Sequence, residues 1–151
     1  MIRLSKLTDY AVVMLSHMAA REKEVYTTCR LADRTAVPEP TAAKILKSLA
    51  KSGILVSLRG SNGGYELARP AAAISVAEII VALDGPIALA ACVDGSDDHC
   101  GVESLCSMRG NWNRVNRAIR SALEEITLAD MAAHPFTPPP PPEARPAESL
   151  S

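Results

Sequence analysis

The sequence predicts a mainly helical protein with a small β-hairpin: a winged helix-turn-helix followed by a long C-terminal dimerisation helix. Three observations predict this fold. Apolar residues recur three or four positions apart through three segments within residues 4–49, as in amphipathic helices. Between residues 54 and 67 the pattern changes to short β-type runs around a glycine-rich turn. A long amphipathic segment then spans about residues 111–126.

The composition is that of one folded domain. A chain of 151 residues with 48% hydrophobic and 22% charged residues fits a globular protein, and only 3% of the residues are aromatic, so aliphatic side chains must fill the core. No apolar run approaches the roughly 18 residues that span a bilayer. We therefore expect a cytoplasmic protein that makes no membrane contact.

The charges are distributed unevenly along the chain. Residues 1–70 contain 11 Lys and Arg against 6 Asp and Glu, whereas residues 71–151 contain 5 against 11. The balances of +5 and −6 sum to the net charge of −1. A basic surface favours polyanions, because neutralising phosphates releases counterions. We therefore expect the N-terminal half to face nucleic acid and the rest of the chain to serve another purpose.

The first two helices are predicted by their caps and their apolar spacing. Ser5 suits the N-cap of the first, and the polar stretch 21–24 ends it. Its apolar positions are Leu4, Leu7, Ala11, Met14, Leu15 and Met18. Thr27 or Thr28 caps a short second helix, which buries Leu31 and Ala32. Cys29 lies in this apolar-periodic segment, and we interpret it as a small buried hydrophobic residue.

A third helix and a hairpin complete the predicted winged module. Pro38 breaks the second helix, because the residue before a proline disfavours the α region. Pro40 suits the first turn of the third helix, and Gly53 suits its C-terminal end. The apolar positions between them are Ile45, Leu46 and Leu49. A strand over 54–58, a turn over 59–64 and a returning strand over 65–67 form the wing.

The third helix is the candidate reader of the DNA major groove. In a helix-turn-helix, the N-terminal residues of the second helix reach base edges while neighbouring groups hold phosphates. The candidates on this helix are Glu39, Pro40, Thr41, Lys44 and Lys47. The alternative is that its lysines form only a solvated face. The wing favours DNA binding over this alternative. Arg59 precedes a turn that contains Gly60 and Asn62, and an arginine at such a tip suits insertion into a narrow minor groove.

The remainder of the chain predicts a fourth helix, a cysteine-containing loop and a dimer interface. Ser75 and Glu78 have the spacing of a capping box for a helix that runs through Leu83. The loop spans residues 91–108. The long helix after it carries an apolar stripe that a two-fold partner would cover; its residues are Trp112, Val115, Ile119, Leu123 and Ile126.

The C-terminal residues form a separate region. Residues 134–151 contain 7 of the 11 prolines, including the run from Pro138 to Pro142. Such a composition is typical of a disordered, polyproline-like tail. The predicted DNA-binding and dimerisation domain is therefore residues 1–133.

Three cysteines in the loop predict metal or redox chemistry. Cys92, Cys100 and Cys106 have the spacing C-x7-C-x5-C. Structural disulfides are rare in the cytoplasm, and thiolates are soft ligands that suit zinc or iron–sulfur clusters. Three thiolates are one ligand short of a closed site. The fourth ligand would be a different side chain, solvent or a group from a partner subunit.

Four parts of the sequence together resemble the Rrf2 family of bacterial transcription regulators. They are Leu4–Ala11, Val56–Tyr65, the three-cysteine loop and Ile126–Met131. The resemblance covers about residues 1–132 and is greatest to the regulators of the SUF iron–sulfur assembly system. It implies a homodimeric winged-helix protein that binds promoter DNA and carries a [2Fe-2S] or [4Fe-4S] cluster on the three cysteines.

Two departures from the family pattern concern this cluster. Arg109 stands where the Isc regulators of the family place a histidine ligand, and a guanidinium cannot ligate. The seven-residue gap after Cys92 is also longer than the usual five.

Two other side chains are candidates for the fourth ligand. Asp9 matches an aspartate that reaches across the dimer in nitric-oxide-sensing members, although it could instead only complement the dipole of the first helix. His99, beside Cys100, is the second candidate.

The three-cysteine loop and this resemblance together imply a regulator that senses iron–sulfur or redox status and controls SUF genes. The alternatives are a nitric-oxide-sensing repressor, a zinc or thiol-redox winged-helix regulator without a cluster, and a winged-helix scaffold that binds protein. An enzyme is not expected, because the histidines His17, His99 and His134 form no nucleophile–base pattern with the cysteines or serines.

Overall fold

Three helices open the chain in this computed structural model, which describes residues 3–96, 99, 101 and 105–133. Helix α1 spans Lys6–Ala19, α2 spans Thr28–Thr35 and α3 spans Glu39–Lys51. The order and approximate bounds of these helices match the prediction from apolar spacing. The proline-rich segment 134–151 lies outside the described residues, so its predicted disorder stays a prediction.

Side chains cap the first two helices as predicted. The hydroxyl of Ser5 accepts a hydrogen bond from the Thr8 N–H at 3.2 Å, and the hydroxyl of Thr27 accepts one from the Arg30 N–H at the same distance. Each bond satisfies a backbone donor that has no partner inside its helix. Helix α2 ends where Ala36 adopts a left-handed conformation with φ of 58°.

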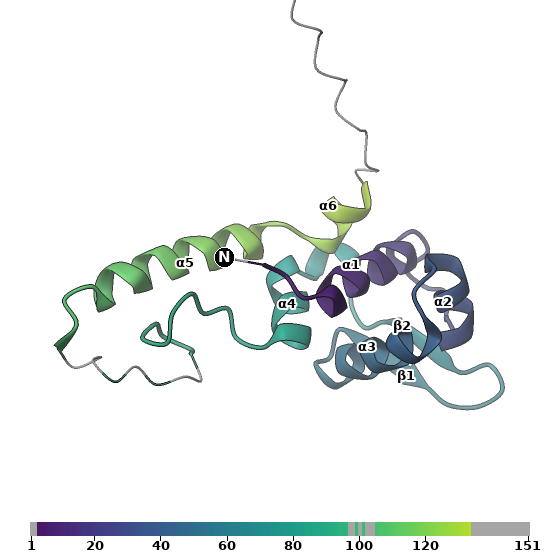
Figure 1. The fold of residues 1–151 in the computed structure, drawn as a ribbon. Coiled ribbons are helices and arrows are strands. Elements are labelled where there is room, and N and C mark those ends of the chain that lie inside the picture. The colour runs from purple at the N-terminus through teal and green to yellow at the C-terminus, as the bar shows by residue number, and fades with distance from the viewer. Residues whose placement is uncertain (1–2, 97–98, 100, 102–104, 134–151) are drawn as a thin grey trace, which may run out of the picture.

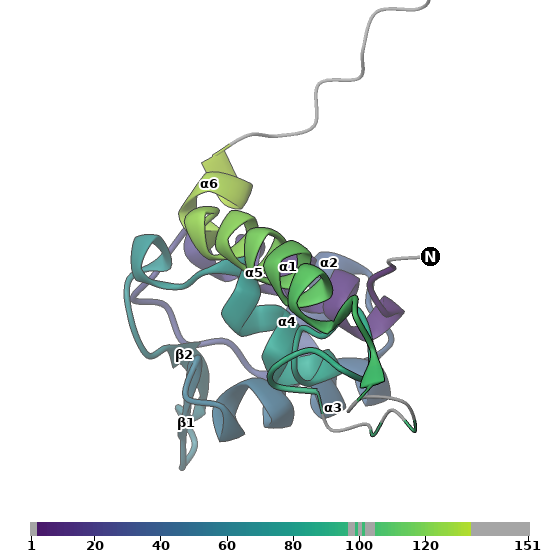
Figure 2. The same ribbon diagram turned by 90° about the vertical axis from the view of Figure 1, so that its left-hand side faces the viewer.

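A two-stranded antiparallel hairpin follows α3. Strand β1 spans Leu55–Leu58 and β2 spans Gly64–Leu67, with Leu55 opposite Leu67. Gly53, at φ of 81°, turns the chain from α3 into β1. With the preceding helices, this hairpin makes the winged helix-turn-helix that the sequence predicts, and Figures 1 and 2 both show the hairpin beside α3.

The core is aliphatic, as the composition requires. Helix α1 packs against α2, α3, α4 and α6, so its inward side lies at the centre of the domain. The largest fully buried apolar side chains come from α1, α2 and α3, from the residue before β1, and from α4, α6 and the residue Ile74 before α4: Met14, Leu15, Met18, Leu31, Ile45, Leu46, Leu49, Ile54, Ile74, Ile79 and Leu128. Burial of these side chains is the main force that holds the helices together.

The chain continues through a short 3-10 helix at Ala71–Ala73 and helix α4 at Val76–Asp84. The predicted capping box is present. The Ser75 hydroxyl accepts a hydrogen bond from the Glu78 N–H at 3.2 Å, and the Ser75 N–H donates to the Glu78 carboxylate at 2.8 Å. These reciprocal bonds fix the start of α4.

Helix α5, at Arg109–Glu125, extends away from the winged module, whereas α6, at Leu128–Ala133, packs on α1 (Figure 1). The junction between them pairs with the chain before α4. The Val76 N–H donates to the Ile126 carbonyl at 2.9 Å, and the Leu128 N–H donates to the Ile74 carbonyl at 2.8 Å. The base of α5 is therefore joined to the winged module by backbone hydrogen bonds.

Helix α6, like the short 3-10 helix at Ala71–Ala73, was not predicted as a separate element from the sequence pattern. The Thr127 N–H donates to the Asp130 carboxylate at 2.9 Å, and the Asp130 N–H donates to the Thr127 hydroxyl at 3.1 Å. This exchange caps the helix in the same way as the box at the start of α4. None of the described helices is both long enough and apolar enough to span a membrane.

Candidate DNA-binding surface and cysteine segment

The predicted DNA-reading residues of α3 lie on its exposed side. Glu39, Pro40, Lys44 and Lys47 are exposed, and Thr41 is half-buried. The opposite side of the helix carries Ala42, Ile45, Leu46 and Leu49, which are all fully buried in the core. Packing of this apolar side thus leaves the N-terminal turn and the lysines of α3 free for a ligand.

The tip of the wing is exposed as well. Arg59, Gly60 and Asn62 are all solvent-accessible. The tip is closed by a hydrogen bond from the Gly63 N–H to the Gly60 carbonyl at 3.0 Å. A Cβ atom on Gly63 would lie 2.3 Å from the Leu58 carbonyl oxygen, so only glycine fits this tight turn.

The wing and α3 are held in a defined relative position. The Ile54 N–H donates to the Leu49 carbonyl at 3.0 Å, and the buried Ile54 and Leu55 anchor β1 in the core. Figure 1 shows α3 and the hairpin together on the side of the module away from α6. One surface therefore presents both α3 and the hairpin, the two elements that the prediction assigns to neighbouring DNA grooves.

Cys29 is not the buried hydrophobic residue that the apolar periodicity predicts. Its thiol is exposed and lies 3.9 Å from the Asp33 carboxylate, one turn further along α2. The buried side of α2 carries Leu31 and Ala32, and Cys29 falls on the opposite side. The carboxylates of Asp33 and then Glu39 raise the pKa of the Cys29 thiol, since negative charge nearby disfavours the thiolate.

The structure places two of the three predicted cluster ligands. The side chain of Cys92 is buried, Cys106 is half-buried, and both are free thiols. Cys100 lies outside the described residues. Asp9 and His99, the candidates for the fourth ligand, are both exposed. Within the described part of the chain, no three His, Cys, Asp or Glu side chains come together as a metal site.

Two asparagines of α5 hold the segment on either side of Cys92, and neither was predicted from the sequence pattern. The Asn116 side chain accepts a hydrogen bond from the Leu89 N–H at 2.9 Å and donates to the Ile87 carbonyl at 3.0 Å. The Asn113 side chain accepts from the Asp94 N–H at 2.8 Å. The residue types alone did not single them out, because α5 also contains Asn111 and other polar side chains.

The predicted dimer stripe of α5 divides into two parts. Trp112, Val115 and Ile126 are exposed, each with between 42% and 46% of its surface accessible to solvent. Ile119 and Leu123 are half-buried and face a recess that Leu4, Ile80, Ile87 and Leu89 of the same chain also line. The exposed apolar surface continues instead through the small residues Ala118 and Ala122. These residues leave one side of α5 without a partner within the described chain.

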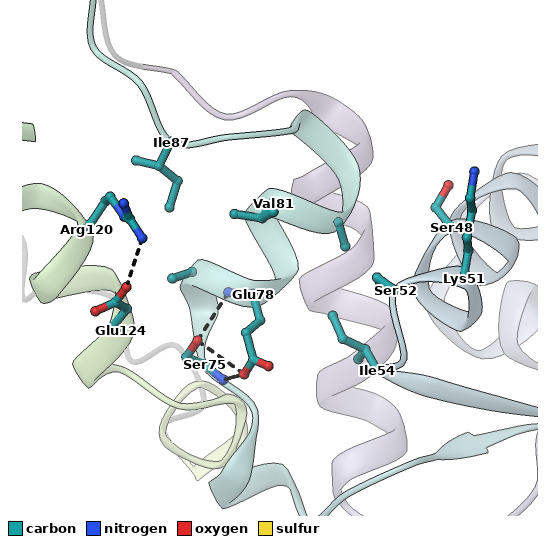
Figure 3. Close-up of a pocket in the computed structure, with 12 residues that line it drawn as sticks. Ser48, Lys51, Ser52, Ile54, Ser75, Glu78, Val81, Ile87, Arg120 and Glu124 are labelled. Carbon is teal, nitrogen blue, oxygen red and sulfur yellow. Dashed lines mark hydrogen bonds and ion pairs between the residues drawn. The ribbon is translucent and has the colours of Figure 1, made fainter. Parts of the chain in front are cut away.

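A groove of about 710 Å³ separates the C-terminal end of α3 from α4 and α5 (Figure 3). Ser48, Lys51 and Ser52 lie on one side of it, and the ion pair of Arg120 with Glu124, at 3.7 Å, lies on the other. The groove therefore lies between the predicted DNA-reading helix and the predicted dimer helix.

The fold and this exposed surface define the class of protein, a winged-helix transcription regulator. Residues 4–134 match the Rrf2 family of iron-dependent transcriptional regulators, and the chain belongs to this family.

Three relatives support the assignment. The regulator NsrR of Oceanobacillus iheyensis is 30% identical over 131 residues, which cover 86% of this chain and 89% of NsrR. The structure of T. potens IscR has a TM-score of 0.64 and 28% identity, with 87% of each chain covered. That of CymR, the global cysteine regulator of B. subtilis, has a TM-score of 0.68 and 25% identity, covering 88% of this chain and 98% of CymR.

Proposed function

We propose that this Rrf2-family regulator senses iron–sulfur or redox status through a cluster bound to Cys92, Cys100 and Cys106, and that it controls genes for iron–sulfur assembly of the SUF type. The observation that carries the proposal is the position of the cysteine segment. It lies between the winged module and α5, and Cys92 is buried and free within it. The description of the family as iron-dependent supports the same function.

The donor set fits an iron–sulfur cluster. Thiolates are the usual ligands of such clusters, and three of them leave one position for a weaker ligand. When bound, the cluster supplies a redox-active and chemically labile centre. Asp9 of a partner subunit is one candidate for the remaining position, because its side chain is exposed on the first turn of α1. His99, also exposed, is the other.

DNA recognition requires two copies of the winged module. In the proposed dimer, the exposed stripe of α5 packs against its counterpart, and each α3 enters the major groove of one half-site. Lys44, Lys47 and Arg59 then supply positive charge toward phosphates or the minor groove. Because half-sites lie about one helical turn apart, a shift of a few ångströms between the two modules would lower the affinity.

The chain offers a direct route from the cysteine segment to the DNA-reading surface. Residues 87–94 are hydrogen-bonded to α5 through Asn113 and Asn116. The base of α5 is in turn bonded to residues 74–76, which lead into α4. In the proposed mechanism, a change in order at Cys92 alters the position of α5 and hence the spacing of the two modules.

Anaerobic purification tests this function. We expect a coloured protein that contains iron and acid-labile sulfide, and alanine substitution of Cys92, Cys100 or Cys106 should abolish the visible absorption. Cys29→Ala is the matched control and should retain it, because Cys29 lies on the DNA-facing module. Cluster-loaded and metal-free protein should differ in operator affinity at fixed salt; equal affinities, or a colourless protein with stoichiometric zinc, would contradict the proposal.

A second candidate is a nitric-oxide-sensing repressor, which the 30% identity to NsrR favours. The two functions differ in the signal and in the target genes. Exposure of the cluster-loaded protein to nitric oxide should abolish operator binding in the second case, and genome-wide mapping of bound promoters would identify the genes in either case.

A further inference from the structure

The segment from the end of α4 to Val93 has no regular secondary structure, and yet parts of it are buried. Ile87 and Leu89 are half-buried, Val93 is 4% exposed and Cys92 is 9% exposed. Buried backbone N–H and C=O groups need hydrogen-bond partners. Here a side chain of α5 supplies these partners.

We propose that Asn116, assisted by Asn113, is a positioning residue that holds the backbone on both sides of Cys92 against α5. Asn116 is 2% exposed, and its amide uses both its acceptor, toward the Leu89 N–H, and its donor, toward the Ile87 carbonyl. A carboxamide presents a donor and an acceptor together, so it can satisfy the two backbone groups at once. Substitution by an apolar residue would leave both groups unpaired.

Asn113 acts on the other side of the cysteine. It lies three residues before Asn116, on the adjacent turn of α5, and accepts from the Asp94 N–H at 2.8 Å. Cys92 thus lies between two backbone positions that α5 holds. A turn closed by the Val93 N–H and the Ala90 carbonyl, at 3.3 Å, encloses it. The Cys92 thiol is therefore placed before any ligand binds.

This proposal rests on the proposed function only in treating Cys92 as a cluster ligand. The positioning itself is a property of the metal-free chain. It predicts that the Cys92 thiol becomes reactive when the amide contacts are removed, because alkylation of a buried thiol requires local opening of the structure.

The test compares Asn116→Ala and Asn113→Ala with Asn111→Ala in the full, reduced, metal-free chain. Asn111 is the matched control, since it is an exposed asparagine of α5 whose amide contacts Met108, the residue just before the helix. The readout is the rate of Cys92 alkylation by iodoacetamide, measured by mass spectrometry. The exposed Cys29 is the internal reference in every sample.

We expect the ratio of Cys92 to Cys29 alkylation to rise about tenfold in Asn116→Ala, less in Asn113→Ala, and not in Asn111→Ala. Amide hydrogen exchange should rise at Leu89 in the first variant and at Asp94 in the second, a local pattern that general destabilisation would not produce. An unchanged ratio in both variants, or an equal rise in the control, overturns the proposal. Failure of the wild-type protein to bind iron and sulfide would instead refute the proposed function, and the alkylation ratios would still decide the positioning role.

Discussion

Tyr26 and Tyr65 exchange two backbone hydrogen bonds, at 2.9 and 2.8 Å, and so join the segment before α2 to the second strand of the wing. Tyr26 is buried, the Arg30 guanidinium lies 4.7 Å from its ring centroid, and its hydroxyl donates to the Glu24 carboxylate at 3.1 Å. Burial, followed by the contact with Glu24, raises the pKa of this tyrosine. The helix-turn-helix and the wing therefore form one unit, which a DNA-binding surface made from both requires.

Gly64→Ala should destabilise this junction. A Cβ atom at position 64, where φ is 152°, would lie 2.4 Å from the Tyr26 carbonyl oxygen, so the backbone must move to accept it. We expect a loss of about 1–3 kcal/mol in the free energy of unfolding, measured by urea denaturation. Ser61→Ala, at the exposed tip of the same hairpin, should change it by less than about 0.5 kcal/mol. If Gly64→Ala had the same free energy of unfolding as the wild type, the backbone at this junction would be able to move without cost, contrary to the prediction.

Asp84→Asn should reduce the dependence of stability on pH in acid. Burial opposes ionisation of Asp84, but hydrogen bonds from Ser5 and Thr8 outweigh it and hold the pKa of this carboxyl below its ordinary value of 3.8. A lowered pKa in the folded state gives stability that is complete above the unfolded-state pKa and is lost as the pH falls through the folded-state pKa.

The free energy of unfolding of the wild type should therefore decrease more steeply below about pH 4 than that of Asp84→Asn. Urea denaturation at a series of pH values measures this difference. Asp33→Asn, which removes an exposed carboxylate from α2, is the control for the change in net charge. Parallel curves for the wild type and Asp84→Asn would contradict the prediction.

Arg59→Ala and Lys44→Ala should weaken operator binding by different mechanisms. Lys44→Ala should remove a phosphate contact, which reduces the slope of log affinity against log salt concentration by about one and affects all DNA sequences alike. Arg59→Ala should remove a minor-groove arginine, which also reduces any preference for A·T base pairs beneath the wing. Gel-shift titrations at several salt concentrations, on operators that differ in A·T content beneath the wing, distinguish these two mechanisms. Arg117→Ala, an exposed cation on α5, is the control, and equal losses in all three variants would remove α3 and the wing from recognition.

Ala118→Glu should dissociate the proposed dimer. Ala118 lies in the exposed apolar surface of α5 with Val115 and Ala122, where a carboxylate would be desolvated without a partner. We expect at least about a tenfold rise in the dimer dissociation constant by sedimentation equilibrium, equivalent to about 1.4 kcal/mol. Ser121→Glu places the same charge on an exposed flank of α5 and should have little effect. A dimer that tolerates Ala118→Glu would use a different surface.

Several features of the fold follow from short stretches of sequence. The caps at Ser5 and Thr27, the box of Ser75 with Glu78 and the turn at Gly53 all depend on residues that are close together in the chain. Such contacts form whenever the local backbone adopts its preferred conformation. The order of the main elements, and with it the winged-helix class, could therefore be predicted from the spacing of apolar residues and from the residues that cap helices and form turns.

Other features depend on segments that meet only in the folded chain. The bonds of Asn116 to residues 87 and 89 span 29 and 27 positions, and the pairing of Tyr26 with Tyr65 joins separate elements. The exposure of Cys29 also depends on tertiary contacts, because the helices that pack against α2 decide which of its sides is buried. By itself, the sequence determined which elements form and which chemical groups the chain contains. Tertiary packing decided which of these groups are buried, paired or exposed, since long-range contacts require the whole core to assemble.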